Sequence, residues 1–503
     1  MGCFLRRIRD APTPTAALGL LLALAATASA QQAPLSRSLE TALRARPAGG
    51  TEIVWVFFRD KGERPGQGGI GDLAHLTPRA LDRRAVRADL PTLAGYEDLG
   101  LVRRYVDEVA RRVTLLRNES RWFNAVSADA TAEQVEALSR LPFVERLDVV
   151  RRYRRPKQEP AIPLDLATES ALPRARRDEL GLDYGTSRGQ VAQINIPAVH
   201  DQGLHGEGIV IAVFDSGFNN LAHEAFSTMD VLETRDFVNG DRDVSDGSDK
   251  GRGDHGTQTL SVLGGFRPGQ LIGPAFAAGF LLAKTENTES ETPVEEDNWA
   301  AAAEWAEARG ADVISSSLGY LDFDNPATSY GFEDMDGETA ISTQAADRAA
   351  ARGVVVVNSA GNSGFNASHN TLGAPADGKK VIAVAAVSPG GIRTEFSSVG
   401  PSADGRIKPD LAAQGSLVKA ASPGRGDGYG LVAGTSFSCP LTAGVAALLL
   451  QAHPTYKVDV VGDMLRTTAS QAARPDTLLG WGIVDALAAI RAPTLKPIFP
   501  FPR

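Results

Sequence analysis

Short apolar runs that alternate with helical patterns are the feature that most limits how this chain can fold. The runs are apolar at successive positions rather than at every second one, so we expect strands that are buried on both faces. Between them lie "NWAAAAEWAEARG" and "TAISTQAADRAAARG", whose apolar residues recur with helical spacing. Strand–helix alternation of this kind indicates a mostly parallel α/β sheet. The runs themselves are "GIVIAVF", "FAAGFLLA", "ADVISSS", "GVVVVNS" and "KVIAVAAV".

The chain of 503 residues is longer than one ordinary domain, and its character changes along its length. Residues 1–30 combine three arginines, an apolar run and the ending Ala-Ser-Ala, which predicts a secretory signal peptide. Residues 31–155 carry strand patterns and an amphipathic helix, so we expect a small α+β unit. Residues 156–183 are rich in proline and charge and are predicted to be an exposed linker with the processing site. The α/β domain then covers residues 184–493, and residues 494–503 form a tail.

Charge and cysteine content narrow the class of protein. The net charge of −9 divides into +2 over residues 1–30, +4 over residues 31–180 and −15 over residues 181–503. Opposite signs predict attraction between the two segments, and the acidic balance argues against a nucleic-acid partner. Once the signal peptide is removed only Cys439 remains, so an internal disulfide is excluded. No later segment is long and apolar enough for us to predict a membrane span.

Four polar residues lie where predicted strands end or predicted helices begin, the places where parallel sheets gather functional groups. Asp215 follows "GIVIAVF" and His255 opens "DHGTQTLSVLGG". Asn362 lies in "SAGNSG", and Ser436 lies in "GTSFSCP" at the start of a long apolar helix, where we expect it to be exposed. Taken singly, each has a structural explanation as a cap, a helix start or a turn residue. Together, the order Asp, His, Ser is typical of a hydrolytic triad.

The chemistry explains these residue types. A serine hydroxyl is a poor nucleophile until an imidazole takes its proton, and a buried carboxylate orients that imidazole. A side-chain amide and a backbone N–H can then stabilise the oxyanion.

These four blocks resemble the signature blocks of the subtilisin-like serine proteases, and the resemblance extends over residues 185–489. It implies a subtilisin-like three-layer sandwich with a mostly parallel central sheet, preceded by a small inhibitor-like α+β prodomain. It implies Asp215 as the orienting carboxylate, His255 as general base and then acid, and Ser436 as the nucleophile. Asn362 is implied as the oxyanion-hole donor.

The family also binds its peptide substrate as an added strand along a sheet edge. "VISSSLGY" matches that edge, with Ser317, Leu318 and Gly319 offering backbone groups to the substrate. The alternative is that this stretch is an ordinary strand end.

The sequence departs from the family pattern at several positions. Gln258 and Thr259 stand where a second histidine is frequent, and Leu441 stands where another is common. None of these positions carries the chemistry, so we expect activity to survive. Tyr320 replaces a frequent glycine and is expected to reshape the specificity groove. Cys439 lies one helical turn beyond Ser436, and we expect a small buried packing residue.

Two weaker signals leave alternatives open. The loop "DRDVSDGSD" holds Asp241, Asp243, Asp246 and Asp249, whose carboxylates suit a structural calcium ion. A solvated acidic loop is the favoured interpretation, because the final glutamate of a twelve-residue calcium loop is missing. The cluster "RRYRRPK" at residues 151–157 marks either the release point of the prosegment or a hydrophilic strand end.

The sequence therefore predicts a secreted, self-processing serine endopeptidase of bacterial origin. We expect it to act on protein or peptide substrates as a monomer, with its own prosegment as intramolecular inhibitor. The site needs no metal and no cofactor. A catalytically silent binding protein is the rival from another class, and an intact triad speaks against it. An α/β-hydrolase esterase would need a G-x-S-x-G elbow, which Ser436 lacks. A convertase that cleaves after paired basic residues stays open within the family.

Overall fold

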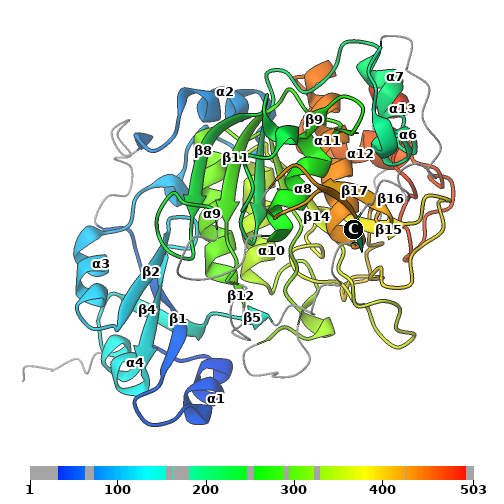
Figure 1. Ribbon diagram of the computed structural model, residues 1–503. Helices are drawn as coiled ribbons and strands as arrows, with labels where there is room; N and C mark the ends of the chain where they lie inside the picture. Colours follow the sequence, from blue (N-terminus) through cyan, green and yellow to red (C-terminus); the bar gives the residue numbers. More distant parts are fainter. Residues whose placement is uncertain are drawn as a thin grey trace, which may run out of the picture.

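The computed structural model describes residues 32–62, 73–153, 162–163, 181–245, 254–287, 294–321, 329–424 and 426–493. The predicted signal peptide and the predicted C-terminal tail lie outside these residues, as does most of the predicted linker. Two units are packed side by side, an N-terminal α+β unit and a larger α/β unit (Figure 1).

The N-terminal unit is a four-stranded antiparallel sheet in the order β2-β3-β1-β4. Three helices, α1, α3 and α4, cover its outer face, and α4 begins at a capping box formed by Thr131 and Gln134. A further helix, α2, lies apart from this sheet (Figure 1). The bounds are β1 Thr51–Phe58, β2 Leu115–Ser120, β3 Ala125–Thr131, β4 Val144–Val149, α1 Arg37–Ala45, α2 Pro78–Arg87, α3 Arg103–Ala110 and α4 Ala132–Ser139.

Strand β1 explains how the two units are joined. Its side chains alternate between two apolar clusters, as the period of two in a strand requires. Val54, Val56 and Phe58 pack under the helices of the N-terminal unit. Trp55 and its alternating neighbours pack on the other face, together with Ile341 of the α/β unit. The run "TEIVWVFF" is therefore buried on both faces because the second unit covers what would otherwise be an exposed face.

The α/β unit is built on a seven-stranded sheet in the order β16-β15-β14-β13-β7-β11-β8, and all neighbouring strands pair in parallel. Because all strands run the same way, their carboxyl ends share one edge of the sheet. The strands are β7 Val210–Asp215, β8 Asp230–Asp236, β11 Gly279–Lys284, β13 Val313–Ser316, β14 Val355–Ser359, β15 Ile382–Val387 and β16 Leu411–Gln414.

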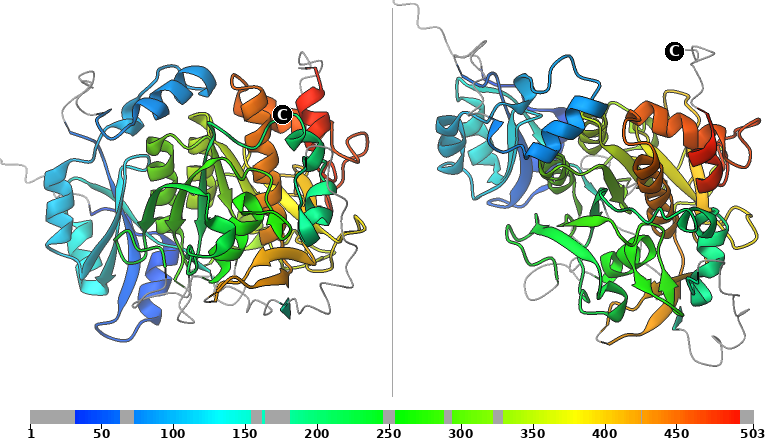
Figure 2. Two further views of the ribbon diagram at one scale, coloured as in Figure 1. Left: turned by 45° about the horizontal axis from the view of Figure 1, so that its top comes forward. Right: turned by 90° about the horizontal axis from the view of Figure 1, so that it is seen from above.

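Helices cover both faces of this sheet and complete three layers (Figures 1 and 2). Helices α8 and α11 share an apolar core with one face, and α9 and α10 share a second core with the other. Short helices and ribbons complete the unit. The helices are α6 Arg188–Ala192, α7 Ile196–His200, α8 Asp254–Gly264, α9 Glu296–Arg309, α10 Ile341–Ala351, α11 Thr435–Ala452, α12 Val458–Thr467 and α13 Ala486–Arg491; the short strands are β5 Arg152–Tyr153, β6 Ile162–Pro163, β9 Phe266–Arg267, β10 Leu271–Ile272, β12 Val294–Glu295, β17 Val418–Ala421 and β18 Tyr429–Val432.

By length and composition alone the α11 helix could cross a membrane, so the expectation that no later segment is long and apolar enough is wrong. Within the fold, however, 89% of it is buried, so it serves as the central core helix. Among the described residues it is the one helix of this kind.

All five predicted strands of the α/β unit are present, and both predicted helices form α9 and α10. Strands β8 and β16, at the two sheet edges, were not predicted from the sequence. Strand β8 reads "DVLETRD" and is largely exposed, so it lacks the apolar run by which the others were found. The predicted linker is also more ordered than expected at one point, because Ile162–Pro163 pairs with β18.

Candidate functional site

Asp215 lies at the carboxyl end of β7, with its carboxylate fully buried. One oxygen of this carboxylate accepts a hydrogen bond from Nδ1 of His255 at 2.7 Å. The other accepts one from the hydroxyl of Thr259 at 2.8 Å, and the backbone N–H of Ser216 donates a third at 2.8 Å. A carboxylate only accepts, so Nδ1 carries the proton and Nε2 is left as the basic nitrogen of the ring.

His255 is the second residue of α8 and is 4% exposed. The next residue explains how it comes so close to β7. A Cβ on Gly256 would lie 2.2 Å from the carbonyl oxygen of Gly217 and 3.0 Å from Cβ of Asp215. Only glycine allows this close approach of α8 to β7.

Ser436 occupies the first turn of α11, directly after β18 and a glycine turn. Gly434 has φ +146°, a conformation that a side chain would strain. The ring of His255 packs against the ring of Phe437, with centroids 5.5 Å apart. The structure thus brings Asp215, His255 and the start of α11 to the same edge of the sheet. Ser436 is only 4% exposed, so the expectation that it stands open to solvent is wrong.

The burial of Ser436 follows from its contacts with Ser317. The Ser436 hydroxyl lies 3.4 Å from the carbonyl oxygen of Ser317, at the long end of the hydrogen-bonding range. In return, the Ser317 hydroxyl donates to the carbonyl oxygen of Ser436 at 2.8 Å.

Asn362 lies in the turn after β14 and faces the same helix start. Its Oδ1 accepts hydrogen bonds from the backbone N–H and the hydroxyl of Thr435, both at 2.9 Å. With the oxygen held, the amide cannot flip, and Nδ2 lies 3.6 Å from where a Cβ on Gly434 would stand. The amide donor is therefore fixed beside the glycine turn that precedes Ser436.

The segment Ser317–Gly319 leaves the end of β13 and passes beside Ser436. The carbonyl oxygen of Leu318 accepts from Nδ2 of Asn358 at 2.9 Å and from the hydroxyl of Ser359 at 3.3 Å. Leu318 thus contributes its buried side chain here, since its carbonyl is already bonded within the fold. Beyond it, Tyr320 is buried and pairs with Ala374 through backbone hydrogen bonds of 2.9 and 3.2 Å.

Cys439 is fully buried, as predicted. Its Sγ lies 3.4 Å from the carbonyl oxygens of Ser316 and Val357, between α11 and two strands. Burial raises the pKa of this thiol to about 12, so it stays protonated and inert at neutral pH.

Two short strands from the region between the units approach the site from different directions. Strand β5 pairs antiparallel with β12, which leads directly into α9. Trp299 of α9 donates to the hydroxyl of Ser316 at 3.0 Å, so this pairing lies on the Ser317 side of the site. Strand β6 pairs antiparallel with β18, which leads into Ser436 from the other side.

Comparison with known proteins identifies the family of both the α/β unit and the N-terminal unit. The sequence profile of the subtilase family matches residues 206–482, and the profile "Peptidase S8 propeptide domain, Bacteroidota" matches residues 53–162. Subtilisin NAT of Bacillus subtilis subsp. natto and subtilisin E of Bacillus subtilis (strain 168) are each 30% identical over 329 residues. These alignments cover 65% of this chain and 77% of each relative. The chain belongs to the subtilase family.

Further relatives support the fold of this subtilase. The subtilisin of Bacillus pumilus is 31% identical over 302 residues, which cover 59% of this chain and 97% of the relative. The crystal structure of fervidolysin from Fervidobacterium pennivorans, a keratinolytic enzyme related to subtilisin, superposes with a TM-score of 0.62 and 21% identity. The match covers 92% of this chain and 64% of fervidolysin. At this identity the likeness shows the fold alone. The predicted subtilisin-like fold is confirmed, and the chain is a subtilisin-like serine peptidase with a propeptide.

The propeptide, by which we mean the N-terminal unit over residues 32–153, covers helices α9 and α10 of the subtilase domain. Asp297 is fully buried beneath it and accepts hydrogen bonds from Arg117 at 3.1 Å and from Asn118 at 3.0 Å. Glu304 accepts the backbone N–H groups of Arg121 at 3.0 Å and of Trp122 at 3.2 Å. Basic and amide groups of the propeptide thus contact carboxylates of the subtilase domain. These contacts agree with the predicted attraction between the basic N-terminal segment and the acidic remainder of the chain.

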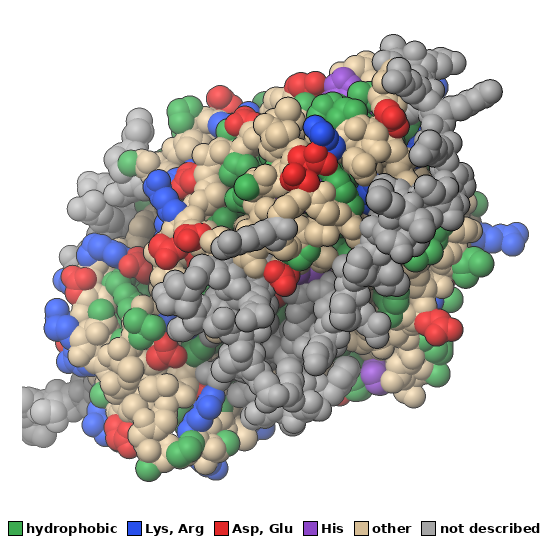
Figure 3. Space-filling view, viewed as in Figure 1, with side chains coloured by type: hydrophobic (Ala, Val, Ile, Leu, Met, Phe, Trp, Pro, Cys, Tyr) green, Lys and Arg blue, Asp and Glu red, His purple; other side chains and the backbone are tan. Residues whose placement is uncertain are grey.

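Acidic and basic side chains intermix over the face of the molecule in Figure 3, so no single charged patch stands out there. In the predicted acidic loop, Asp241 accepts the backbone N–H of Asp243 at 2.9 Å, and Asp243 accepts that of Ser245 at 3.0 Å. Asp246 and Asp249 lie outside the described residues. No cluster of three metal-binding side chains occurs in the described part of the subtilase.

Thr259 is the site residue that sequence reasoning misjudged. The sequence predicts no part in the chemistry for this position, yet the Thr259 hydroxyl donates a hydrogen bond to the second carboxylate oxygen of Asp215. The signal was present, because residues four apart on a helix share a face, and Thr259 follows His255 by four positions.

Proposed function

We propose that this subtilase is a secreted serine endopeptidase that cleaves peptide bonds through an acyl-enzyme and processes its own precursor. The observation that carries the proposal is the 2.7 Å hydrogen bond between Asp215 and Nδ1 of His255, with the imidazole packed beside the start of α11. That bond leaves Nε2 as the base next to the nucleophile Ser436.

In the first step, Nε2 of His255 takes the proton of the Ser436 hydroxyl while the oxygen attacks the substrate carbonyl carbon. The new imidazolium is stabilised by Asp215, which keeps its negative charge throughout. The tetrahedral intermediate collapses when His255 gives the proton to the leaving amine. His255 then takes a proton from a water molecule, whose oxygen attacks the acyl-enzyme carbonyl. The second tetrahedral intermediate collapses when His255 returns the proton to the Ser436 oxygen, which frees the acid product, so no cofactor is required.

The oxyanion that forms in each step needs donors that are already in place. Asn362 supplies one through Nδ2, whose direction is fixed by the two bonds from Thr435 to Oδ1. The backbone N–H of Ser436 supplies the other, because the first amides of a helix have no intrahelical partner.

Substrate is proposed to add as a strand beside Ser317 and Gly319, with Leu318 buried beneath them. Main-chain pairing gives affinity for many sequences, which suits an endopeptidase acting on extended segments of proteins. Buried Tyr320 then shapes the floor of the groove.

The precursor supplies its own first substrate. Tyr153 is paired on one side of Ser436 and Ile162 on the other, so the chain between them connects the two flanks of the site. We place the scissile bond in this connection, "RRPKQEPA", at the start of the predicted linker. Until the propeptide leaves, it occupies the substrate edge and inhibits the enzyme.

Export is proposed from the predicted signal peptide, which lies outside the described residues. The Bacteroidota propeptide match and the Bacillus relatives support a bacterial source.

Expression of the full chain and of Ser436→Ala, followed by N-terminal sequencing and a casein assay, tests the proposal. The full chain should yield a product that begins between residues 154 and 162 and hydrolyses casein. Ser436→Ala should keep its propeptide, begin after the signal peptide and leave casein intact.

Equal processing of both chains would exclude self-cleavage. A full chain that leaves casein intact after loss of its propeptide would favour the rival, a silent binding protein.

A further inference from the structure

Helix α2 of the propeptide stands away from the propeptide sheet and lies over the subtilase domain (Figure 2). Thr77 caps its first turn and Pro78 opens it. Four arginines at spacings of four, one and three residues place their side chains toward one side of the helix. They are Arg79, Arg83, Arg84 and Arg87.

The two central arginines enclose one carboxylate of the subtilase domain. Glu307, near the end of α9, is fully buried and forms an ion pair with Arg83. Arg84 binds the same carboxylate in a bidentate manner, through two hydrogen bonds of 2.7 Å, one to each oxygen. Arg83 also donates to the carbonyl oxygens of Glu307 at 3.0 Å and Ala311 at 2.7 Å. Burial opposes ionisation of Glu307, but the charges of Arg83 and Arg84 outweigh it and hold the pKa of Glu307 below its usual value.

The two outer arginines share a second carboxylate. Asp312 forms an ion pair with Arg79 and accepts a 2.8 Å hydrogen bond from Arg87. Arg79 also donates to the carbonyl oxygen of Gly208 at 2.7 Å, and Arg87 donates to that of Pro454 at 2.9 Å. The helix is thus held by backbone carbonyls as well as by charge.

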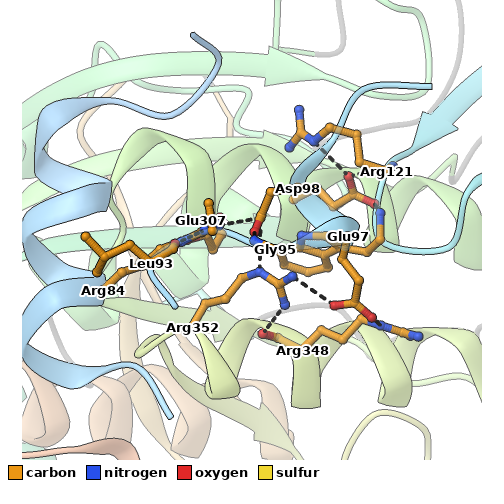
Figure 4. A network of polar contacts seen from close by, with 12 residues as sticks. Arg84, Leu93, Gly95, Glu97, Asp98, Arg121, Glu307, Arg348 and Arg352 are labelled. Atoms are coloured by element: carbon orange, nitrogen blue, oxygen red, sulfur yellow. Dashed lines mark hydrogen bonds and ion pairs between the residues drawn. The ribbon is translucent and has the colours of Figure 1, made fainter. Parts of the chain in front are cut away.

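The network continues beyond Glu307 (Figure 4). Arg84 reaches from Glu307 to Asp98 of the propeptide, at 2.8 Å. Arg352, which caps α10, donates to Glu97 of the propeptide at 2.9 Å. The propeptide and the subtilase domain therefore each contribute both acidic and basic groups, and each of these charged groups has a partner of opposite charge in the network.

The shape of the surface also fits α2. A Cβ on Gly310 would lie 2.7 Å from the side chain of Arg79, and a Cβ on Gly353 would lie 2.8 Å from Cβ of Arg87. Both glycines end helices in the left-handed conformation, at φ +92° and +88°. The lack of a side chain at Gly310 and Gly353 therefore lets α2 lie close against the ends of α9 and α10.

This contact is remote from the catalytic site. Asp312 precedes β13 and accepts the backbone N–H of Val210, the first residue of β7. The surface thus lies at the amino-terminal edge of the sheet, while Asp215 lies at the other end of β7. A six-residue strand spans roughly 20 Å, so the two sites are separated by about the length of β7.

We propose that the surface around Glu307 and Asp312 is a second binding site for the propeptide, specific for a helix that presents four arginines on one face. Its occupant is α2, and its function is to keep the cleaved propeptide on the enzyme after the connection at residues 154–161 is cut. This rests on the self-processing proposed above. Two linked anchors dissociate more slowly than either alone, because one holds while the other opens. Withdrawal of α2 also breaks the ion pairs that Glu307 and Asp312 form with its four arginines.

The experiment compares the self-processed full chain with two double variants of the helix, Arg83→Met/Arg84→Met and Arg79→Ala/Arg87→Ala. Gel filtration measures how fast the cleaved propeptide separates, and the lag before casein hydrolysis gives the same rate independently. Loss of buried charge pairs should speed separation about 10–100-fold and shorten the lag equally. The released enzyme is the same polypeptide in every case, so its final casein rate serves as the internal standard.

The matched control is Arg103→Ala/Arg140→Ala, which removes two exposed arginines whose ion pairs, to Glu119 and Glu136, stay within the propeptide. It should separate at the parent rate. Separation of both helix variants at that rate would overturn the proposal. If the Arg83→Met/Arg84→Met variant does not fold well enough to accumulate, the Arg79→Ala/Arg87→Ala variant carries the test. Its Arg79 side chain is partly exposed, so its loss disturbs the fold less.

Failure of the proposed function gives a different result, namely a full chain that never processes itself. In that case hydrogen exchange in the intact chain carries the test. The amides of residues 306–312 should exchange about 10-fold faster or more in the helix variants than in the control, as expected for loss of a docked partner. Equal exchange would count against the second binding site.

Discussion

Ser317 donates its hydroxyl proton to the carbonyl oxygen of Ser436 at 2.8 Å, and this bond replaces one that the helix cannot make. In α11 the carbonyl of Ser436 would normally accept the N–H four residues on, but that residue is Pro440, which has none. The proline inside the helix is thus tolerated because Ser317, the residue directly after β13, donates the missing hydrogen bond. The same bond fixes the backbone of the proposed nucleophile.

The first prediction concerns this bond. Ser317→Ala should lower the free energy of unfolding by about 1–3 kcal/mol, because it leaves a buried carbonyl without a donor. In a Pro440→Ala background the loss should be smaller, since residue 440 then offers its own N–H. The four chains to compare are the parent, Ser317→Ala, Pro440→Ala and the double variant, all carrying Ser436→Ala to prevent self-cleavage. Urea unfolding of these chains gives the coupling energy between residues 317 and 440.

Ser315→Ala is the matched control, because Ser315 is another buried serine, two residues earlier in β13, with Cys439 Sγ 3.9 Å from its hydroxyl. Its cost should not depend on residue 440. Equal costs of Ser317→Ala in both backgrounds would falsify the assignment.

The second prediction concerns Asn362. Asn362→Asp keeps the oxygen that Thr435 holds and replaces the proposed oxyanion donor with a negatively charged carboxylate oxygen. The loss of kcat should be about 10²–10³, the value known from subtilisin itself for loss of one oxyanion-hole donor, with KM nearly unchanged. Asn362→Ala should lose a similar factor. Full kcat in the aspartate variant, measured on a peptide substrate, would exclude Asn362 from the oxyanion hole.

The sequence predicted the central strands because each is a continuous apolar run, and it placed Asp215, His255, Asn362 and Ser436 at strand ends and helix starts where the structure has them. It did not predict that Ser436 would be buried, since that depends on contacts with Ser317, 119 residues away in the chain. Such pairings follow from how the layers pack.

The propeptide shows the same limit more clearly. Its β1 strand was found from its apolar run, but α2 was not, because its buried side is made of arginines rather than apolar residues. A helix face made of arginines is normally predicted to be exposed to solvent, unless the carboxylates that it contacts are known. Glu307 and Asp312 are more than 200 residues further along, so local sequence holds no sign of the match.

The third prediction concerns Thr259, a positioning residue that acts through Asp215. Thr259→Val keeps the shape of the side chain and removes the donor, so the carboxylate loses a charge-assisted hydrogen bond. We expect kcat to fall about 10-fold with KM unchanged, since such bonds contribute roughly 1.5–3 kcal/mol and part of this is recovered by relaxation. Thr259→Ser should restore kcat because it restores the hydroxyl. A valine variant with parent kcat, or a change confined to KM, would remove Thr259 from this role.

The last prediction concerns Glu296, which is fully buried at the start of α9 beside the propeptide. It accepts hydrogen bonds from the hydroxyl of Tyr330 at 2.6 Å and from the backbone N–H of Ser342 at 2.5 Å. Burial raises the pKa of Glu296 to about 7, against which these bonds and the charge of Arg151 act only in part.

Between pH 4.5 and 7 the folded chain therefore binds more protons at Glu296 than the unfolded chain does, so the free energy of unfolding should fall as pH rises through this window. The shift corresponds to about 3 kcal/mol. Glu296→Gln cannot ionise and should remove this slope, so its stability relative to the parent should rise by about 3 kcal/mol from pH 4.5 to 8. Tyr330→Phe should act in the opposite sense, because it removes a donor that favours the ionised form. Urea unfolding across this pH range, in chains carrying Ser436→Ala, measures both differences. A difference between Glu296→Gln and its parent that stays constant with pH would show that Glu296 does not titrate here, and the fall in stability would then have to come from another group.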